Sequence, residues 1–463
     1  MDNVIQSSVF PKLQPCSEKG LYFRTNARVA ISLQKQEAIF ETGGILRTNT
    51  YFNSISIGKI KKYTNLTNLS LCLNFRGQFK ITWKVRILHQ GDKVVQEDRV
   101  VGEEIGSQEI VLPFWDSLSE GMLFFELQAL EDSVLFGFHY STKDAPVRRV
   151  CLGLVITHFN RPQEVEKTAL RFKKELLQGP YYEGKIQLII VDNSRNLPRS
   201  LADEKGIAVI PNRNLGGSGG FSRGLIHLHH AGDFTHGLFM DDDASSEIES
   251  IRRTFFYLTY THEPKLAIAG AMLRAVQPNM QHENGGRFDG LCYPIKCYYN
   301  LLLTRDLLRN EQEEPIDYGA WWYFAFPLQA VKHLAFPYFV RGDDIGFSLA
   351  NNFHIMTVNG ISSWQADFSH KAGPLQIYLD QRNQIMHFFH GIVKDNRKRK
   401  LLKATLTLFV LNSLAYQYES ARACTLAIYD VLKGPDFWRD NVDMKAKRAE
   451  LLALTQQQKI CSI

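Results

Sequence analysis

The stretch from Arg148 to Asn196 contains three segments: RRVCLGLVITHFNRP (148–162), EVEKTALRFKKELLQ (164–178) and KIQLIIVDNSRN (185–196). The first and third are apolar runs that end in polar turns, and the second carries apolar residues at helical spacing. A buried strand, a helix and another buried strand in this order are typical of a largely parallel sheet covered by helices. The stretch therefore predicts an α/β domain.

The same alternation continues to residue 244. GIAVIPNRN (206–214) and HGLFMDDDA (236–244) predict two more strands, with a glycine-rich turn and a helix, NLGGSGGFSRGLIHLHHAG (214–232), between them. Each predicted strand ends in a polar tail: HFNRP, VDNSRN, PNRNLGG or MDDDA. Ligands of such sheets bind beyond the carboxyl ends of the strands. Four tails at one edge therefore predict a binding site there.

The segments before residue 150 predict strands of a different kind. ARVAISL, SLCLNF, KITWKVRIL and MLFFELQAL are short and rich in branched or aromatic residues. In KITWKVRIL, Ile81, Trp83 and Val85 alternate with Lys84 and Arg86, which suits a sheet with one solvated face. We expect an antiparallel β-sandwich over residues 1–149.

After residue 391 the sequence becomes helical and basic. KDNRKRK (394–400) precedes the apolar run LLKATLTLFVLNSLAY, whose 16 residues are fewer than the about 20 that span a bilayer. This run predicts a buried or interfacial helix, and residues 443–459 predict one more amphipathic helix. The domains expected are 1–149, an α/β domain at 150–391, and a helical region at 392–463.

Composition narrows the class of protein. The chain has 463 residues, 44% of them hydrophobic and 22% charged, as in a soluble protein of two or three domains. A net charge of +6 does not indicate nucleic-acid binding, but it suits an anionic substrate or an anionic membrane surface. Seven scattered cysteines and a start without a signal-peptide pattern predict a reducing, cytoplasmic location.

The acidic triplet Asp241–Asp243 follows the apolar run GLFM. Asp241 and Asp243 offer hard oxygen ligands to Mg²⁺ or Mn²⁺, and a bound dication would remove the repulsion between neighbouring carboxylates. The alternative is a solvated helix N-terminus, because ASSE continues like a capping sequence. The buried strand before the triplet favours the metal site.

The glycine-rich segment NLGGSGGFSRG (214–224) lets the backbone approach a phosphate or a sugar, and Arg213 and Arg223 flank it with positive charge. It matches neither a P-loop nor a dinucleotide fingerprint, and a plain turn into a helix is the alternative. Weaker donor-site candidates are Asp192, which could accept from a base or ribose, and Arg161 and Arg382, which could pair with an anion.

Two further segments carry candidate chemistry. Trp321 and Trp322 in YGAWWYFAFP could stack on sugar rings or belong to the core. Asp343 and Asp344 in FVRGDDIGFS could supply a general base for a sugar hydroxyl, or could begin a capped helix. His370 in WQADFSHK could be a third metal ligand or a phosphate contact.

These pieces resemble, in this order, inverting glycosyltransferases of the GT-A fold, and more closely the polymerising galactofuranosyltransferases of bacterial surface glycans. The matching segments are TYFNSISIGKIKKYT, THFNRP, VDNS, NLGGSGGFSRG, MDDDA, WWYFAFP, RGDDIGFS and a downstream histidine. They cover about residues 20–390. NLGGSGGF and WW with RGDD are fairly specific, whereas the metal motif is shared by much broader families.

The resemblance implies UDP-galactofuranose as the donor and a galactofuranose-containing glycan, often lipid-linked, as the acceptor. It implies Arg161, Asp192 and Asn214 as nucleotide ligands, Asp241, Asp243 and His370 as ligands of Mn²⁺ or Mg²⁺, Trp321, Trp322 and Asp343 as acceptor contacts, and Asp344 as the base. Gly216, Gly217, Arg223, Asp242 and Arg382 complete the predicted donor site.

The chain departs from the cell-wall polymerases in its shorter C-terminal part, which leaves product length and homo-oligomer formation open. Two other readings stay open as well. One is a rhamnosyl- or other hexosyltransferase of the same fold, because nothing in the sequence fixes the sugar. The other is a non-catalytic glycan-binding protein. The basic KDNRKRK segment suits peripheral contact with the inner membrane leaflet, or an ordinary solvated face.

Overall fold

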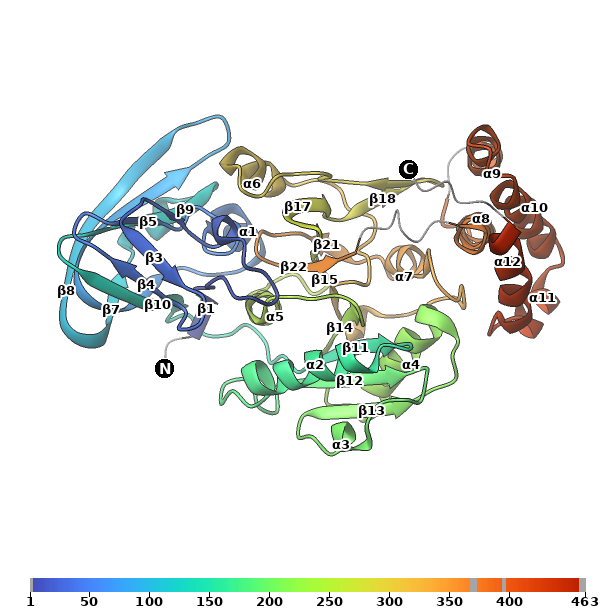
Figure 1. Ribbon diagram of the computed structural model, residues 1–463, viewed down its shortest axis with the longest axis horizontal. Helices are drawn as coiled ribbons and strands as arrows, with labels where there is room; N and C mark the ends of the chain where they lie inside the picture. The colour runs from blue at the N-terminus through green and yellow to red at the C-terminus, as the bar shows by residue number, and fades with distance from the viewer. Residues whose placement is uncertain (1–2, 367–372, 394–396, 458–463) are drawn as a thin grey trace.

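The computed structural model describes residues 3–366, 373–393 and 397–457 of the 463-residue chain. Strands of the N-terminal part lie at one end, an α/β region occupies the centre, and the last helices pack at the far end (Figure 1). Residue 370, the predicted third metal ligand, and residues 394–396 of the basic segment lie outside the described residues.

The N-terminal part is one ten-stranded antiparallel sheet with the order β2-β5-β9-β7-β10-β4-β3, to which β1, β6 and β8 are added at the side. Its elements are β1 (Asn3–Ser7), β2 (Arg24–Thr25), β3 (Val29–Ser32), β4 (Glu37–Phe40), β5 (Ile45–Arg47), β6 (Ile55–Ser56), α1 (Ile57–Tyr63), β7 (Ser70–Arg86), β8 (Asp92–Val111), β9 (Met122–Ala129) and β10 (Ser133–Thr142).

Strand β7 has different neighbours along its two halves within the one sheet. Its first half pairs with β10, its second half pairs with β9, and β8 follows it along nearly its whole length. Gly77, at a φ of 104°, lies at the bulge between the halves. The predicted alternation is confirmed, because Ile81, Trp83 and Val85 are buried. The antiparallel pairing is also confirmed, but one continuous sheet takes the place of the two separate sheets expected of a sandwich.

The central sheet has the order β13-β12-β11-β14-β20-β15-β21. Its strands are β11 (Leu152–His158), β12 (Ile186–Asp192), β13 (Ile207–Pro211), β14 (His236–Asp241), β15 (Leu266–Ala269), β20 (Phe324–Pro327) and β21 (His354–Met356). Strands β13, β12, β11 and β14 are parallel, β20 runs antiparallel to both neighbours, and β15 is parallel to β21. The predicted α/β class and the mainly parallel pairing are therefore confirmed.

Helices cover both faces of this sheet. They are α2 (Pro162–Phe172), α3 (Arg199–Ala202), α4 (Gly216–Ala231), α5 (Ile248–Tyr260) and α7 (Asp343–Asn351). Helices α2 and α5 share one core cluster with the side chains of β11 and β12 that point to their face. Helices α4 and α7 contribute to the cluster on the other face. Strands β11 and β12 are apolar along most of their length because both of their faces are covered.

The strand register fixes where the polar tails meet. His158 pairs with Asp192, Asp192 pairs with Pro211, and Thr157 pairs with Asp241. The carboxyl ends of four parallel strands therefore lie along one edge, as the sequence predicts.

A smaller sheet and the C-terminal helices complete the chain. The sheet and its hairpin comprise β16 (Ala271–Arg274), β17 (Gln277–Glu283), β18 (Gly286–Phe288), β19 (Cys292–Pro294) and β22 (Ser362–Gln365), with α6 (Thr304–Asn310) nearby. The last helices are α8 (Pro374–Phe389), α9 (Arg397–Leu414), α10 (Tyr418–Leu432), α11 (Pro435–Asp440) and α12 (Lys445–Gln457). Within the ranges described, every helix is too short or too polar to cross a bilayer.

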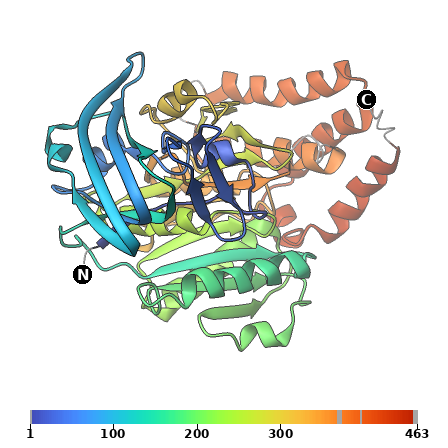
Figure 2. The same cartoon turned by 60° about the vertical axis from the view of Figure 1, so that its left-hand side comes forward.

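The N-terminal strands lie against the central region (Figure 2), and helix α5 packs against β1 of the N-terminal sheet (Figure 1). The Glu249 carboxylate accepts a hydrogen bond from the Ser7 amide at 2.6 Å, and Glu247 accepts one from the Tyr22 hydroxyl at 2.7 Å. The Arg253 guanidinium donates to the Phe52 carbonyl. These side chains are buried, so the two regions share a polar interface that excludes solvent.

Candidate active site

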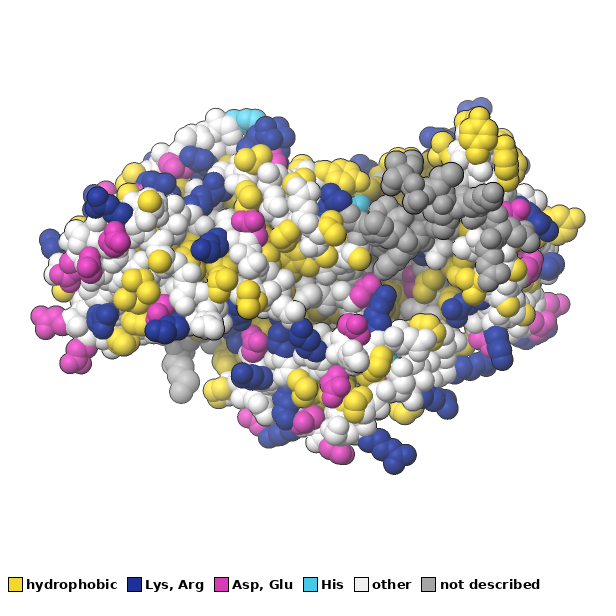
Figure 3. Space-filling model, in the orientation of Figure 1, with side chains coloured by type: hydrophobic (Ala, Val, Ile, Leu, Met, Phe, Trp, Pro, Cys, Tyr) yellow, Lys and Arg dark blue, Asp and Glu magenta, His cyan; other side chains and the backbone are white. Residues whose placement is uncertain are grey.

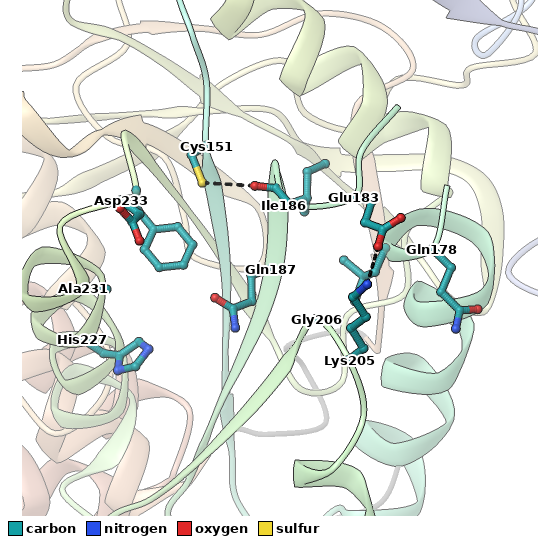
Figure 4. A pocket seen from close by; sticks show the side chains of 13 residues that line it. Cys151, Gln178, Glu183, Ile186, Gln187, Lys205, Gly206, His227, Ala231 and Asp233 are labelled. Carbon is teal, nitrogen blue, oxygen red and sulfur yellow. Dashed lines mark hydrogen bonds and ion pairs between the residues drawn. The ribbon is translucent and has the colours of Figure 1, made fainter. Parts of the chain in front are cut away.

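Two cavities lie at opposite ends of the parallel strands. One, of about 520 Å³, is lined by residues at the amino ends, including Cys151, Ile186, Gly206 and Asp233 (Figure 4). The other, of about 630 Å³, lies at the carboxyl ends and is lined by Asp241–Asp243. Parallel sheets bind ligands at the carboxyl end, and the carboxylates gather there, so we assign the chemistry to the second cavity.

The second cavity brings together predicted residues that are far apart in sequence. Its lining includes Arg161 at the start of α2, Gly217 in α4, Asp241, Asp242 and Asp243 at the end of β14, Trp321 and Trp322 before β20, and Asp343 and Asp344 at the start of α7. Nine of the predicted site residues thus surround one space.

Two of the three acids of the triplet, Asp242 and Asp243, contact the cationic side chain of Arg161. Asp242 accepts from the Phe159 amide at 2.9 Å and from Arg161 Nη1 at 2.5 Å, and His158 Nδ1 lies 3.7 Å away. Burial raises the pKa of Asp242, but the nearby His158 and the hydrogen bonds from Phe159 and Arg161 outweigh it, so the net shift is downward. Arg161 Nη2 also lies 3.2 Å from Asp243.

Repulsion between the neighbouring carboxylates acts mainly on Asp241. Burial, Asp243 and Asp242 together raise its pKa to about 7, although Gln365 Nε2 donates to Oδ2 at 3.3 Å. A carboxylate with so high a proton affinity also attracts a metal cation. Asp241 and Asp243 therefore fit a hard dication such as Mg²⁺ or Mn²⁺, although no three potential ligands gather around one point within the described ranges.

Of the pair Asp343 and Asp344, the first is buried and the second is half-buried. The Ser218 hydroxyl donates to Asp343 Oδ2 at 2.9 Å, and burial raises the pKa of Asp343 to about 6. Burial, then Asp343, Glu283 and Asp241, raise the pKa of Asp344 well above its ordinary value. Asp344 is thus a strong proton acceptor beside a space that can hold a substrate.

A strained loop holds the pair in place. Phe339, Arg341 and Gly342 have φ values of 75°, 69° and 79°, a region that non-glycine residues rarely occupy. Asn383 Nδ2 donates to the carbonyls of Val340 and Arg341 at 2.9 and 2.7 Å. Hydrogen bonds from helix α8 therefore stabilise the unusual backbone that places Asp343 and Asp344.

Arg382 differs from its prediction as an anion ligand. Its guanidinium is 1% exposed, donates to the Tyr338 carbonyl at 2.5 Å, and lies 4.4 Å from the Trp438 ring centroid. It supports the strained loop from behind and does not line the cavity. A helical pattern could not show which side of α8 faces the site.

The glycine-rich turn packs against the same loop. Gly216, at a φ of 72°, leaves no room for a Cβ, which would stand 2.0 Å from the Phe339 carbonyl oxygen, and Ser218 N donates to that oxygen at 3.1 Å. Asn214 Oδ1 accepts from the Gly216 amide at 3.0 Å. Asn214 and Gly216 therefore shape the turn, whereas Gly217 reaches the cavity.

Two other donor-site predictions lie outside the cavity lining. Asp192 is 3% exposed, and its carboxylate accepts from the amides of Ser194, Arg195 and Leu197 at 2.9, 2.7 and 3.2 Å. Arg223 is exposed on α4. Asp192 therefore folds the loop after β12, and the structure does not bring Arg223 to the acids.

The two tryptophans belong to different core clusters and both reach the cavity. Trp321 packs with Phe221 and Phe239, at centroid distances of 4.9 and 5.1 Å. Trp322 Nε1 donates to the Gly270 carbonyl at 2.9 Å. Both tryptophans therefore pack in the core and also line the cavity, while a contact with a ligand stays a prediction.

Sequence reasoning missed several lining residues. Glu283 ends β17, and burial raises its pKa to about 7. Tyr318 stands two residues before the alanine–tryptophan run and could have been included with it, whereas Arg448 comes from α12, far along the chain. Only a polar residue before a glycine turn, in the segment HENGG, hinted at Glu283.

Comparison with known proteins places the chain among carbohydrate-active enzymes. It is 26% identical over 473 aligned positions to galactofuranosyltransferase GlfT2 of Mycobacterium tuberculosis, covering 91% of this chain and 71% of the relative. It is 24% identical to GlfT2 of Mycolicibacterium smegmatis, covering 91% and 70%. No protein-family profile matches the sequence.

Among solved structures, the chain matches S. aureus TarS 1–349 with a TM-score of 0.37, 12% identity and coverage of 67% of this chain and 92% of that one. Glucosyl-3-phosphoglycerate synthase from Mycobacterium tuberculosis has a TM-score of 0.34, 15% identity and coverage of 53% and 82%.

The sequence relatives match the chain from the N-terminal sheet into the helical region, as coverage of 91% requires. The resemblance to bacterial galactofuranosyltransferases that the motifs indicate is therefore confirmed, and the chain is a glycosyltransferase.

Proposed function

We propose that the protein transfers galactofuranose from UDP-galactofuranose to a hydroxyl group of a surface glycan, with inversion at the anomeric carbon. The observation that carries the proposal is the single cavity shared by the acidic triplet and the Asp343–Asp344 pair. The acidic triplet suits a leaving diphosphate with its cation, and the Asp343–Asp344 pair suits an attacking hydroxyl. The choice of donor rests on the relatives named galactofuranosyltransferases.

In the proposed reaction Asp344 accepts the proton of the acceptor hydroxyl as its oxygen attacks the anomeric carbon. The bond from that carbon to the diphosphate breaks as the new bond forms, so one displacement inverts the configuration. Asp343, held by Ser218, orients the acceptor, and Trp321 and Trp322 provide apolar walls for sugar rings.

Asp241 and Asp243, with His370, are the residues that would hold Mn²⁺ or Mg²⁺. Such an ion, when bound, neutralises charge on the diphosphate. Arg161 lies beside the triplet and would contact a phosphate oxygen of the donor. Gly217 allows close approach of the donor on the same side.

The donor is tested by offering the purified protein a panel of nucleotide sugars with a galactofuranoside acceptor. We expect transfer from UDP-galactofuranose and a product whose linkage shows inversion. Preference for a rhamnosyl or another hexosyl donor would keep the catalytic assignment but replace the sugar. Transfer that persists at full rate in excess chelator would remove the metal from the proposal.

We further propose that the enzyme works in the cytoplasm, at the inner membrane leaflet, on a lipid-linked acceptor. Helix α9 is apolar on its inner and outer sides: Ala404 is fully buried, whereas Leu406, Val410 and Leu414 are 48%, 45% and 71% exposed. The helix contains Lys and Arg but no Asp or Glu. Hydrophobic side chains gather over α9 with basic ones beside them (Figure 3). This combination suits an anionic lipid surface.

Vesicle sedimentation tests the membrane contact. We expect the protein to bind phosphatidylglycerol vesicles more strongly than phosphatidylcholine vesicles, and Leu406→Asp to weaken that binding. Val101→Asp, at a residue 53% exposed on β8, is the control and should bind like the wild type. Absence of binding at low salt, or a dimer that Leu406→Asp dissociates, would overturn the assignment of this face.

We retain 1–149, 150–391 and 392–463 as the proposed domain limits. The α5 interface and the Arg448 contribution to the cavity imply that the three regions act together.

A further inference from the structure

We propose that a third cavity, of about 350 Å³, is an acceptor subsite that holds the sugar residues preceding the one that reacts. The inference rests on the proposed glycosyl transfer and names a binding site for the non-reacting part of the acceptor. The cavity lies between the β18–β19 hairpin and helices α7, α8 and α9.

The cavity adjoins the active site at the carboxylate loop. Cys292, Arg341, Gly342 and Ile345 line both spaces. From there the third cavity extends past Asp380 and Gln384 of α8 to Thr407 and Leu408 of α9. It therefore leads away from Asp344 on a path that does not include the acidic triplet. A glycan whose terminal hydroxyl reaches Asp344 can place its preceding residues here.

The lining offers an unused hydrogen-bond acceptor. Gln384 Nε2 donates to the Gly290 carbonyl at 2.7 Å, but its Oε1 is buried and has no donor among the residues that the structure describes. An unsatisfied buried acceptor costs about 1–3 kcal/mol, and such atoms call for a ligand or another explanation. A sugar hydroxyl is a suitable donor.

The charge of the cavity argues against a nucleotide or another polyanion. Arg341 is the cation among the described lining residues, and its Nη1 lies 2.6 Å from Asp380 Oδ2, which neutralises it. Phe288, Leu291 and Leu408 supply apolar walls. Apolar walls with a few fixed polar groups suit a neutral ligand that has both hydroxyl groups and apolar ring faces. A carbohydrate has this chemistry.

Such a subsite should affect catalysis as well as binding. Contacts with a non-reacting part of a substrate can be used to orient the reacting part, so they raise kcat/KM. We expect the wild type to prefer methyl glycosides of three galactofuranose residues over those of one by about tenfold or more in kcat/KM.

The test places a larger side chain in the cavity at the α9 end, away from Asp343 and Asp344. Leu408→Trp should reduce the ratio of kcat/KM for three residues over one by at least fivefold. If Leu408→Trp fails to fold, Thr407→Phe adds a large side chain at the preceding position of α9 and should also reduce this ratio. Ser413→Trp adds a large ring to the same helix away from the cavity lining and is the matched control.

The outcomes separate the subsite from the proposed reaction. An unchanged ratio in both folded cavity variants would overturn the subsite. Transfer from a different nucleotide sugar would overturn the proposed donor, and the ratio would then be measured with that donor. If no donor supports transfer, saturation-transfer NMR with the trisaccharide glycoside replaces the rates. Binding to the wild type that Leu408→Trp abolishes supports the subsite, and equal binding to both overturns it.

Discussion

Asp344 carries the chemistry of the proposed reaction. We expect Asp344→Asn to lower kcat by about 10²-fold or more while leaving donor KM within about twofold. The amide keeps the shape of the carboxyl group but cannot accept the acceptor's proton. Initial rates of UDP release with and without acceptor check this. Asp289→Asn, at an exposed residue whose Oδ2 lies 3.3 Å from Lys400, is the control and should retain wild-type rates. Near-normal turnover of Asp344→Asn would move the base to another carboxylate, Glu283 first.

Asp241 imposes a pH-dependent cost on folding. Its pKa of about 7 in the folded protein exceeds the ordinary 3.8, so between pH 4 and 7 the folded state holds a proton that the unfolded chain has lost. Stability from this group is therefore greatest below pH 4 and is lost as the pH rises to about 7. In chelator, we expect Asp241→Asn to stabilise the protein by about 1–3 kcal/mol at pH 8 and hardly at all at pH 4. Urea unfolding at both pH values measures this, and equal effects at the two would contradict it.

Site residues at strand ends could be predicted from the sequence. An apolar run that ends in acids indicates a buried strand, and it places the acids at the carboxyl end of the sheet. Asp241 and Asp343 are found in this way or by their motif. Arg382 could not be placed, because several sides of α8 are buried and the sequence does not show which one supports the loop. Glu283 has no motif around it, and only the folded hairpin brings it to Asp344.

At the scale of elements, helix α8 positions the loop that precedes α7. Asn383 donates to successive carbonyls of a segment with left-handed residues. We expect Asn383→Ala to lower kcat by about tenfold and the free energy of unfolding by about 1–3 kcal/mol, because the freed loop relaxes. Donor KM should change little. Arg422→Ala, exposed on α10, is the control. Loss of stability without loss of kcat in the folded fraction would limit Asn383 to a structural role.

The parallel strands β11, β12, β13 and β14 were predictable because burial of both faces produces continuous apolar runs. The small sheet β16, β17 and β22 was not, since β17 and β22 are mostly polar and β16 pairs with a segment 91 residues later in the chain. The change of neighbour from β10 to β9 along β7 could not be predicted from the sequence either. Local alternation fixes a strand's faces but not the neighbours along each half of its edge.

At the scale of the whole molecule, the polar interface at α5 should make unfolding of the N-terminal sheet and the central region cooperative. Glu249→Ala leaves the buried Arg253, whose Nε lies 3.6 Å away, without its carboxylate. We expect a loss of about 3–5 kcal/mol in the free energy of unfolding and a single transition in the wild type. Glu104→Ala, exposed on β8, should change stability by less than about 0.5 kcal/mol. Two separate wild-type transitions would contradict the coupling.

The order of strand-rich, α/β and helical segments could be predicted from the sequence pattern, whereas the contacts between these segments could not. Strand, α/β and helical patterns change near residues 150 and 392, and the architecture follows that order (Figure 1). The contribution of Arg448 to the cavity and of Glu249 to the N-terminal interface depends on tertiary packing. No local pattern contains that information.

The interface at α5 also has a consequence for synthesis on the ribosome. The hydrogen bond from Ser7 cannot form until Glu249, 242 residues later in the chain, has been synthesised. The bond to the Phe52 carbonyl likewise requires Arg253. At translation rates of about 5–20 residues per second, this delay is roughly 10–50 s. During that time the nascent sheet exposes a surface that the finished enzyme conceals. We therefore expect the yield of folded enzyme to fall when the chaperones that bind nascent chains are removed.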